Sequence, residues 1–284
     1  MKLFITGAGG KTGKSIIQSL IKKEIDITVY LHRQTSFDEF KKLGDVKPIV
    51  GDLLDNERLQ QALKGIDTVY LIIPNMNPEE ITIGKNIIDI CKRKGVSRII
   101  YHSVLHPQAT SMPHHRQKML VEEYLLESGL DYTILQPTAY MQNILGYRKA
   151  INSGSYPMPY PVTSMISLVD LIDIAEVASN VITQPGHSYS TYELVGTHPL
   201  SQLAIAEVLS LHTNRKVIAE EILLQKWLKS DTVKNMTEYT RKTLYAMFKY
   251  YAAYGLVGNN FVLSQLLSRK ATSLEEFLKR DYII

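Results

Sequence analysis

Cysteine, long apolar runs and a strong excess of charge are all scarce or absent in this sequence of 284 residues. The single cysteine, Cys91, excludes an internal disulfide and fits a reducing compartment; we expect it to be a packing residue on a helix. No run of about 18 apolar residues occurs, so we expect no membrane span. The first residues lack the charged start and apolar stretch of a signal peptide, and we expect a cytoplasmic protein.

The excess of positive charge is small. Lysine and arginine number 32 against 28 aspartate and glutamate residues, a formal net charge of +4. This suits an anionic small ligand, whereas nucleic-acid-binding domains usually carry a strongly basic face. We therefore expect neither nucleic acid nor a membrane as a direct partner.

Short apolar runs alternate with amphipathic helical runs in the first half of the chain. Strands are predicted at residues 2–6, 26–32, 46–53, 67–74, 97–104 and 131–138. Helices are predicted at residues 14–23, 57–65, 79–95 and 115–129, and a helix or a turn at residues 37–44. This alternation predicts an α/β fold, a Rossmann-type doubly wound parallel sheet with helices on both faces. Ligands of such folds bind beyond the carboxyl ends of the strands.

The alternation becomes less regular after about residue 138. We expect residues 1–150 to form the Rossmann domain and residues 151–284 to form a smaller, mainly helical C-terminal lobe. A predicted helix within residues 165–185 returns to the first domain. Residues 153–164, rich in Pro, Ser and Tyr, are predicted to be an irregular loop.

The loop after the first predicted strand, TGAGGKTGKS at residues 6–15, fits two phosphate-binding patterns. From Ala8 onward it matches a relaxed P-loop that ends in Gly-Lys-Ser, although the strict pattern begins with glycine. A P-loop enzyme also needs an aspartate that ends an apolar strand and helps to hold Mg²⁺. In the strand at 67–74 the acid, Asp67, stands at the start, which disfavours the P-loop interpretation.

The same loop fits a dinucleotide-binding turn with glycines at Gly7, Gly10 and Gly13. Gly7 permits a tight turn, Gly10 has no side chain to block a pyrophosphate, and Gly13 lets the helix pack closely on the sheet. The amides of the helix N-terminus then face the phosphates. Gly7, Gly10 and Gly13 are predicted to hold the pyrophosphate, and the predicted cofactor-binding residues of this NAD(P)-binding domain also include Thr6, Lys11 and Thr12.

The end of the second predicted strand discriminates between NAD and NADP. NAD binders usually place an acid there, whereas NADP binders place a cation near the 2′-phosphate. Here the residues are His-Arg-Gln, so Arg33 is the predicted 2′-phosphate ligand and NADP(H) is preferred, with NAD(H) as the alternative. Asp52 and Leu53 are predicted beside the adenine and Pro74 near the nicotinamide half. The structural alternatives are a solvated surface arginine and a helix-capping aspartate.

Six segments together resemble the NmrA-like family, an atypical branch of the short-chain dehydrogenase/reductase superfamily. They are FITGAGGKTGKSI (4–16), HRQ (32–34), GDLLDNERLQQALKGIDTVYLI (51–72), KMLVEEYLLESGLDYTILQPTAYMQNI (118–144), ISLVDLIDIAEVA (166–178) and YELVGTHPLSQLAIAEVL (192–209). The resemblance covers nearly the whole chain. It implies NAD(P)H-dependent reduction of a quinone or a dye, while other members resemble redox sensors that bind the cofactor and a regulatory protein.

The superfamily uses a Tyr-x-x-x-Lys pair with an upstream serine, in which the lysine binds the nicotinamide ribose and lowers the pKa of the tyrosine. The resemblance implies Lys118 as the ribose ligand and Ser103 as the serine. His114 stands where the tyrosine belongs, as a candidate proton donor or as a histidine without chemical role. This departure disfavours alcohol dehydrogenation and sugar-nucleotide epimerisation. It fits quinone reduction, whose oxyanion is a stabilised phenolate, and it fits a non-catalytic sensor equally.

The remaining predictions concern the acceptor, metals and partners. Tyr140 and Asn143 follow the sixth predicted strand and are candidate contacts of the acceptor. The aromatic residues between 245 and 254 are predicted mainly to pack within the lobe, with a face that covers a flat aromatic substrate or a subunit contact as the alternative. We expect no metal site, because the histidines around residues 102–115 lack ligand spacing. The predicted partner is a small acceptor such as a quinone, with a homodimer or a regulatory protein as further options.

Overall fold

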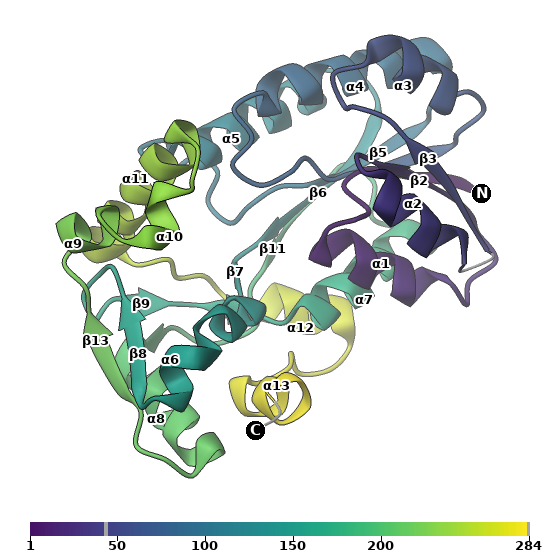
Figure 1. Cartoon of the computed structure of the whole chain (residues 1–284). Helices are drawn as coiled ribbons and strands as arrows, with labels where there is room; N and C mark the ends of the chain where they lie inside the picture. Colours follow the sequence, from purple (N-terminus) through teal and green to yellow (C-terminus); the bar gives the residue numbers. More distant parts are fainter. Residues whose placement is uncertain (43–44, 283–284) are drawn as a thin grey trace. The chain divides into compact units, whose positions relative to one another are not determined.

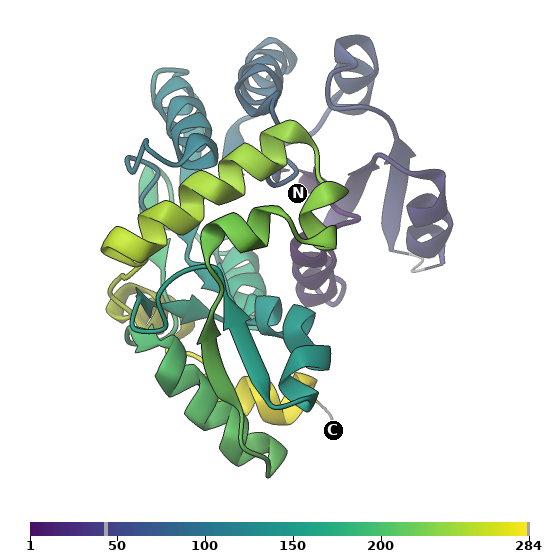
Figure 2. The same cartoon turned by 60° about the vertical axis from the view of Figure 1, so that its left-hand side comes forward.

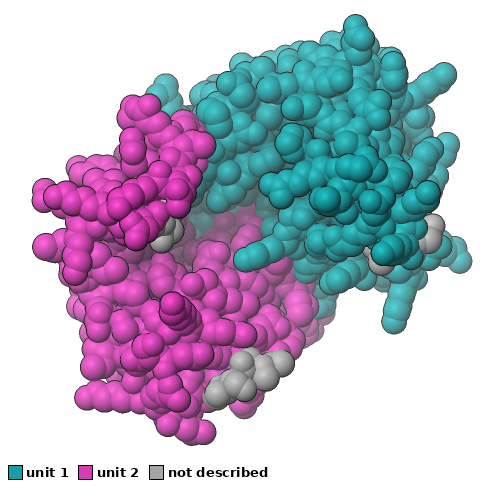
Figure 3. All heavy atoms as spheres, in the orientation of Figure 1, with its two compact units in different colours: residues 1–108, 114–136, 174–192 teal, residues 109–113, 137–173, 193–284 magenta. Residues whose placement is uncertain are grey.

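The computed structural model describes residues 1–42 and 45–282 and divides into two compact units, coloured separately in Figure 3. Unit 1 comprises residues 1–108, 114–136 and 174–192. Unit 2 comprises residues 109–113 and 137–173 and the described residues from Glu193 onward. In this division the chain passes to unit 2 after Gln136, and α7 (Leu171–Thr183) belongs to unit 1 from Ile174 onward. The end of the segment 37–44, predicted as a helix or a turn, lies outside the described residues.

Unit 1 is built on a seven-stranded sheet with the order β11-β6-β5-β4-β1-β2-β3 (Figure 1). Its strands are β1 (Lys2–Ile5), β2 (Asp26–Leu31), β3 (Val46–Val50), β4 (Thr68–Leu71), β5 (Arg98–His102), β6 (Asp131–Pro137) and β11 (Ser190–Leu194). All neighbouring pairs from β6 across to β3 are parallel. The predicted Rossmann-type, doubly wound fold is confirmed, and its strand order reverses between β1 and β4, where such folds bind their ligands.

Helices cover both faces of this sheet. They are α1 (Lys11–Leu20), α2 (Gln34–Lys41), α3 (Asn56–Ala62), α4 (Glu80–Lys94), α5 (Pro113–Leu126) and α7 (Leu171–Thr183). Helices α3, α4 and α5 lie on one face, whereas α1 and α7 lie on the other, where Ser19 Oγ donates to the Ala175 carbonyl at 3.0 Å (Figure 1). Within the described ranges, no helix is both long enough and apolar enough to cross a membrane.

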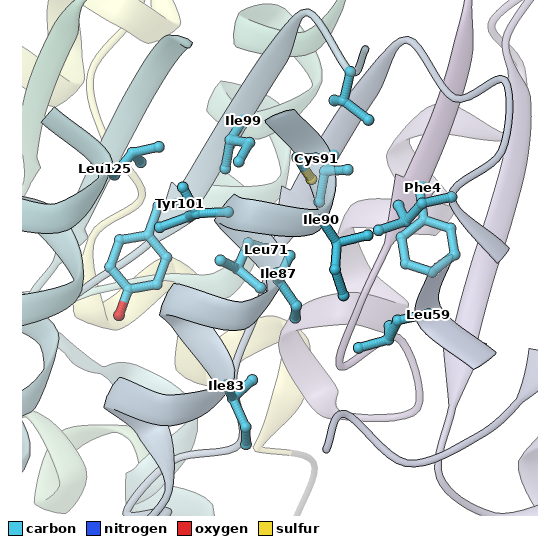
Figure 4. Close-up of a cluster of buried hydrophobic side chains, with 14 of the residues drawn as sticks. Phe4, Leu59, Leu71, Ile83, Ile87, Ile90, Cys91, Ile99, Tyr101 and Leu125 are labelled. Carbon is cyan, nitrogen blue, oxygen red and sulfur yellow. The ribbon is translucent and has the colours of Figure 1, made fainter. Parts of the chain in front are cut away.

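The main core of unit 1 lies between the sheet and helices α3 to α5. Figure 4 shows Phe4, Leu71 and Ile99 pointing from three strands toward helix residues such as Ile87. Alternate strand residues face this core because side chains of a strand point to opposite sides of the sheet. Each fully buried aliphatic side chain contributes roughly 1.5–3 kcal/mol. Cys91 belongs to this cluster, as predicted, and burial raises the pKa of its thiol to about 12.

Unit 2 is mainly helical, with three small two-stranded sheets (Figures 1 and 2). Its helices are η1 (Met141–Tyr147), α6 (Arg148–Asn152), α8 (Gln202–Thr213), α9 (Leu224–Leu228), α10 (Asp231–Lys234), α11 (Glu238–Tyr254), α12 (Phe261–Leu267) and α13 (Leu274–Asp281). Its short strands are β7 (Ala139–Tyr140), β8 (Ser155–Met158), β9 (Met165–Ile166), β10 (Leu168–Val169), β12 (Leu200–Ser201) and β13 (Ile218–Glu221).

One prediction for this region is wrong. Residues 155–158, expected within an irregular loop, form β8 and pair in parallel with β13. The partner strand is distant in the sequence, so the local Pro-rich composition of residues 153–164 gave no sign of the pairing.

Two buried aspartates at the start of α7 hold arginines from the C-terminal part of unit 2. Asp170 and Asp173 have fully buried side chains. Asp170 accepts from Arg280 Nη2 at 2.8 Å, and Asp173 accepts from Arg269 Nη2 at 2.7 Å. Because a buried carboxylate without a partner is costly, these ion pairs tie the late helices of unit 2 to its earlier segments.

Candidate functional site

The turn between β1 and α1 requires glycine at two positions for reasons internal to the fold. Gly7 has a φ of 60°, and a Cβ there would lie 2.9 Å from Ile72 atoms. A Cβ on Gly13 would lie 2.6 Å from the Cα of Ala8, which is backbone and cannot move aside. Gly13 therefore permits the close approach of α1 to the turn, as predicted from its spacing.

Gly10 differs from both, because it is exposed and a Cβ there would meet one backbone atom at a tight but less severe distance. It is exposed at the N-cap of α1, and a Cβ there would meet the Gly7 carbonyl oxygen at 3.3 Å. Among the residues described, no side chain caps this helix end, and its first turn contains no acid. The first amides of α1 are thus available to an anion, and Lys11 and Thr12 begin the helix beside them. This turn fits a dinucleotide diphosphate.

The predicted 2′-phosphate residue lies at the end of β2. Arg33 is exposed and is the N-cap of α2, two residues after the buried end of β2 at Leu31. Its neighbour His32 lies 4.0 Å from Asp52, measured between Nε2 and Oδ2. Lys14, which a P-loop would direct at phosphates, instead donates to both carboxylate oxygens of Glu39, at 2.8 and 2.7 Å. This charge arrangement favours the dinucleotide interpretation of the turn.

The backbone after β3 is held by a close contact with the side chain of Tyr30. The hydroxyl of Tyr30 donates to the Asp52 carbonyl at 3.1 Å, and a Cβ on Gly51 would lie only 2.0 Å from that hydroxyl. Burial, more than neighbouring charges, raises the pKa of Tyr30 to about 12. The Asp52 side chain is exposed and accepts from the Leu54 amide at 2.9 Å, while Leu53 packs against the core.

Two other predicted cofactor residues lie at the ends of β1 and β4. Thr6 is fully buried, and its hydroxyl both donates to the Ile72 carbonyl and accepts from the Ile72 amide, each at 2.8 Å. This bridge fixes the end of β1 to the chain after β4. Pro74 is exposed just beyond that point.

Lys118 lies in a buried ionic cluster between α4, β5 and α5. Its ammonium donates to Glu80 Oε1 at 2.6 Å, and the phenol of Tyr101 donates to the same oxygen at 2.9 Å. A longer contact of 3.4 Å joins Lys118 Nζ to the His102 carbonyl, at the end of β5. Burial first, and then the Glu80 charge, raise the pKa of Tyr101 well above its ordinary value. Tyr101 is therefore a poor substitute for the absent catalytic tyrosine.

Ser103 follows β5 and belongs to a second buried polar group. Its hydroxyl donates to Glu122 Oε1. The Gln136 amide donates to both Glu122 oxygens, at 3.0 and 2.9 Å. Burial raises the pKa of Glu122, although the hydrogen bonds from Ser103 and Gln136 oppose the shift. The Ser103 hydroxyl is thus directed by a carboxylate on the same helix as Lys118.

His114 is buried near the start of α5, with its ring edge-on to His115 at 4.4 Å between centroids. Burial, reinforced by the charges of His115 and Lys118, lowers the pKa of His114 to about 3. The ring is then neutral near pH 7, so it can accept or donate a hydrogen bond but has no extra proton to deliver. His115 Nδ1 lies 2.9 Å from the His106 carbonyl oxygen, which fixes its ring.

The predicted acceptor residues belong to unit 2. Tyr140 is half-buried in β7, and Asn143 is exposed in η1. Unit 2 also contains a cavity of about 350 Å³, with Tyr160 and Phe248 among its apolar walls and Glu221 and Lys249 also lining it. Phe248 packs at 4.9 Å from Trp227 between ring centroids and Tyr251 is buried, whereas Tyr245 and Tyr254 of the same stretch are exposed.

Sequence reasoning missed the partners of Lys118 and Ser103. Glu80, Tyr101, Glu122 and Gln136 carry no motif of their own, and only their contacts reveal them. One signal was present: Lys118 and Glu122 are four residues apart on a predicted helix and so share a face.

The NmrA-like family model matches residues 1–280. Among curated relatives, the NAD(P)H azoreductase of Xenophilus azovorans is 26% identical over 280 residues, which cover 98% of this chain and 96% of the relative. Nearly full coverage of both chains means that the similarity includes both units.

Two solved structures give the same architecture. The NADPH-dependent quinone oxidoreductase QOR2 of Escherichia coli, in complex with NADPH, superimposes with a TM-score of 0.87 at 23% identity, covering 99% of this chain and 100% of that one. NmrA, a negative transcriptional regulator, in complex with NAD, superimposes with a TM-score of 0.82 at 18% identity, covering 99% and 95%. At these identities the similarity supports the fold alone.

Proposed function

Because this chain belongs to the NmrA-like family, we propose that it is an NADP(H)-dependent oxidoreductase that reduces a quinone or a similar conjugated acceptor. The observation that carries the proposal is the turn between β1 and α1. There Gly7 and Gly13 are required because a Cβ at either position would clash with neighbouring atoms. Gly10 is the exposed N-cap of a helix whose first amides have no side-chain cap and can bind a diphosphate. The named activity of the azoreductase relative, which spans the whole chain, supports the same class of reaction.

Arg33 supports NADP(H) as the preferred cofactor. It is exposed two residues after the end of β2, where a guanidinium can bind a 2′-phosphate with a planar, charged fork. His32 and Gln34 flank it, and neither is an acid that would accept a ribose hydroxyl. NAD(H) is the alternative, to be separated by direct titration.

On the nicotinamide side, Lys118 is the proposed ribose ligand and Ser103 is proposed to orient the acceptor. When bound, the reduced nicotinamide supplies the hydride for the acceptor. Holding donor and acceptor together accounts for much of the acceleration in such a reaction. With His114 neutral and Tyr101 bonded to Glu80, the site suits an acceptor whose reduced oxygen is a stabilised phenolate and needs no strong acid. Tyr140 and Asn143 stay candidate acceptor contacts.

Turnover with a panel of quinones tests the proposal. We expect NADPH absorbance to fall when the protein is mixed with NADPH and benzoquinones or naphthoquinones, and NADH to be used less well. Azo dyes belong in the same panel because of the azoreductase relative. Absence of turnover with every acceptor, despite NADPH binding, would contradict an oxidoreductase.

That outcome would favour a second candidate, a redox sensor whose cofactor occupancy alters binding to a regulatory protein. The absence of a ready proton donor at His114 favours it, and the fold of the regulator NmrA is compatible with it. A homodimer or a regulatory partner stays a prediction for either function.

A further inference from the structure

We propose that Glu80 is a positioning residue, which holds the Lys118 ammonium at the carboxyl end of β5 so that it can bind the nicotinamide ribose. The inference rests on the proposed function, because a ribose ligand is needed only if the dinucleotide binds. It goes further by assigning to an acid on α4 a role that no motif in the sequence indicated.

The ion pair between these residues is almost completely removed from water. The Glu80 side chain is fully buried, the Lys118 side chain is 7% exposed, and Oε1 and Nζ are 2.6 Å apart. Glu80 is the first residue of α4, where the helix dipole stabilises a negative charge. The Tyr101 phenol adds a hydrogen bond to the same oxygen. These contacts fix the carboxylate in one place before any ligand arrives.

The ammonium of Lys118 has three N–H donors. The described residues account for one at Glu80 Oε1 and for a second, longer contact at the His102 carbonyl. The third N–H of Lys118 is therefore available to a ligand, while the contacts with Glu80 and the His102 carbonyl hold the ammonium at the end of β5. A ribose hydroxyl is an acceptor of the type that this donor can bind.

The packing of α4 against α5 brings the pair together. A Cβ on Gly84 would lie 2.6 Å from a methyl group of Val121, so only glycine permits this helix contact. Glu80 stands one turn before Gly84, and Lys118 stands about one turn before Val121, so both lie on the facing sides of their helices. A second link, from Gln117 Nε2 to the Pro78 carbonyl at 3.1 Å, fixes the start of α4.

The pair is not arranged for stability alone. Glu80 Oε2 is buried and, within the described part of the chain, has no hydrogen-bond partner. An unsatisfied buried carboxylate oxygen is costly, and buried ion pairs seldom stabilise a fold more than apolar residues of the same size. If Glu80 holds Lys118 in position for a ligand, this role explains why a charged pair rather than an apolar pair occupies the site.

The test is a double-mutant cycle read out by ligand binding. NADPH affinity is measured by its fluorescence for wild type, Glu80→Gln, Lys118→Met and the double variant. We expect Glu80→Gln to weaken NADPH binding on the order of tenfold, as for loss of one charge-assisted contact. In the Lys118→Met background the same change should add less than about twofold, because Glu80 acts through Lys118.

Adenosine 2′,5′-bisphosphate, which lacks the nicotinamide ribose, separates positioning from folding. Glu80→Gln should bind it as wild type does. Glu80→Asp, which keeps the charge on a shorter side chain, should recover part of the NADPH affinity. The matched control is Glu79→Gln at the neighbouring, exposed N-cap position, which should change neither ligand.

Three results would overturn the inference: unchanged NADPH affinity in Glu80→Gln, fully additive losses in the cycle, or equal loss of adenosine 2′,5′-bisphosphate binding in both Glu80 variants. Failure of the proposed function looks different, because wild type itself would then fail to bind NADPH. If wild type binds NADPH but the Glu80 and Lys118 substitutions show no coupling in the cycle, only the role of Glu80 is refuted.

Discussion

The two halves of the candidate site in unit 1 are built in different ways. Around β1, β2 and β3, the predicted ligands Lys11, Arg33 and Asp52 are exposed, Lys11 at the start of α1 and the other two after strand ends. Around β5 and α5, Lys118 and Ser103 are buried, and each is bonded to a carboxylate. In the first half, no side chain from another element is needed to hold the predicted ligand side chain in place. In the second half its action depends on neighbours from other elements, so changes there should affect stability and function together.

The largest expected effect is acid destabilisation of the buried half. Burial lowers the pKa values of His102 and His114 to about 3 and that of His115 to about 4. In the unfolded chain these rings take up protons near pH 6.5, so their contribution to stability is complete above that pH and is lost as the pH falls toward their folded pKa values of about 3 to 4. We expect a loss of about 1–2 kcal/mol per ring between pH 7 and pH 5.

Urea unfolding at pH 7, 6 and 5 measures this loss. His114→Asn should flatten the pH profile, whereas His198→Asn, at an exposed position, should leave it unchanged. A wild-type profile that is flat between pH 7 and pH 5 would contradict the buried neutral state of these rings.

The next largest effect is expected where α4 meets α5. In Gly84→Ala the new methyl group would approach two methyl groups of Val121 to 2.6 and 2.7 Å, so we expect a loss of about 1–3 kcal/mol in unfolding free energy. Chemical denaturation measures it, and adding Val121→Ala should restore part of the loss. Gly146→Ala is the control, because nothing lies within 4 Å of a Cβ there. Equal stability of all three variants would mean that the helices are not closely packed.

In the exposed half, Arg33→Ala should affect binding and leave stability intact. We expect NADPH affinity to fall about 30-fold, equivalent to about 2 kcal/mol, because a charge-assisted contact to phosphate is lost. NADH affinity and the thermal midpoint should stay near their wild-type values. Parallel titrations with the two cofactors measure the difference, and Arg33→Lys, which keeps the charge, should lose less. Equal losses for both cofactors would remove Arg33 from the 2′-phosphate site.

The smallest expected effect concerns Glu122. Burial raises the pKa of its carboxyl group, so its favourable contribution is present below the ordinary value of 4.5 and is lost as the pH rises through the higher folded value. Glu122→Gln should therefore flatten the stability profile above pH 4.5, by less than about 1 kcal/mol. Unfolding between pH 4.5 and 7 tests this, with the exposed Glu123→Gln as control. A steeper decline in Glu122→Gln would contradict it.

These halves also differ in how far the sequence could predict them. The glycine turn and the end of β2 are local features, because their residues follow predicted strands closely in the sequence. Gly7 and Arg33 each lie two residues beyond a strand end, and Gly13 lies in the first turn of α1. The parallel fold was predictable because each strand and helix has its own periodicity. Glu80 could not be assigned, since its contact with Lys118 spans 38 residues and depends on how closely two helices pack. The pairing of β8 with β13 was missed for the same reason.

The two aspartates at the start of α7 have a consequence for biosynthesis. Arg269 follows Asp173 by 96 residues, and Arg280 follows Asp170 by 110 residues. During synthesis, we expect both carboxylates to stay exposed to solvent until these arginines have been translated, because burying them earlier would leave both negative charges without a cation. Unit 2 should thus fold late, and nascent chains stopped before Arg269 should be protease-sensitive in this region.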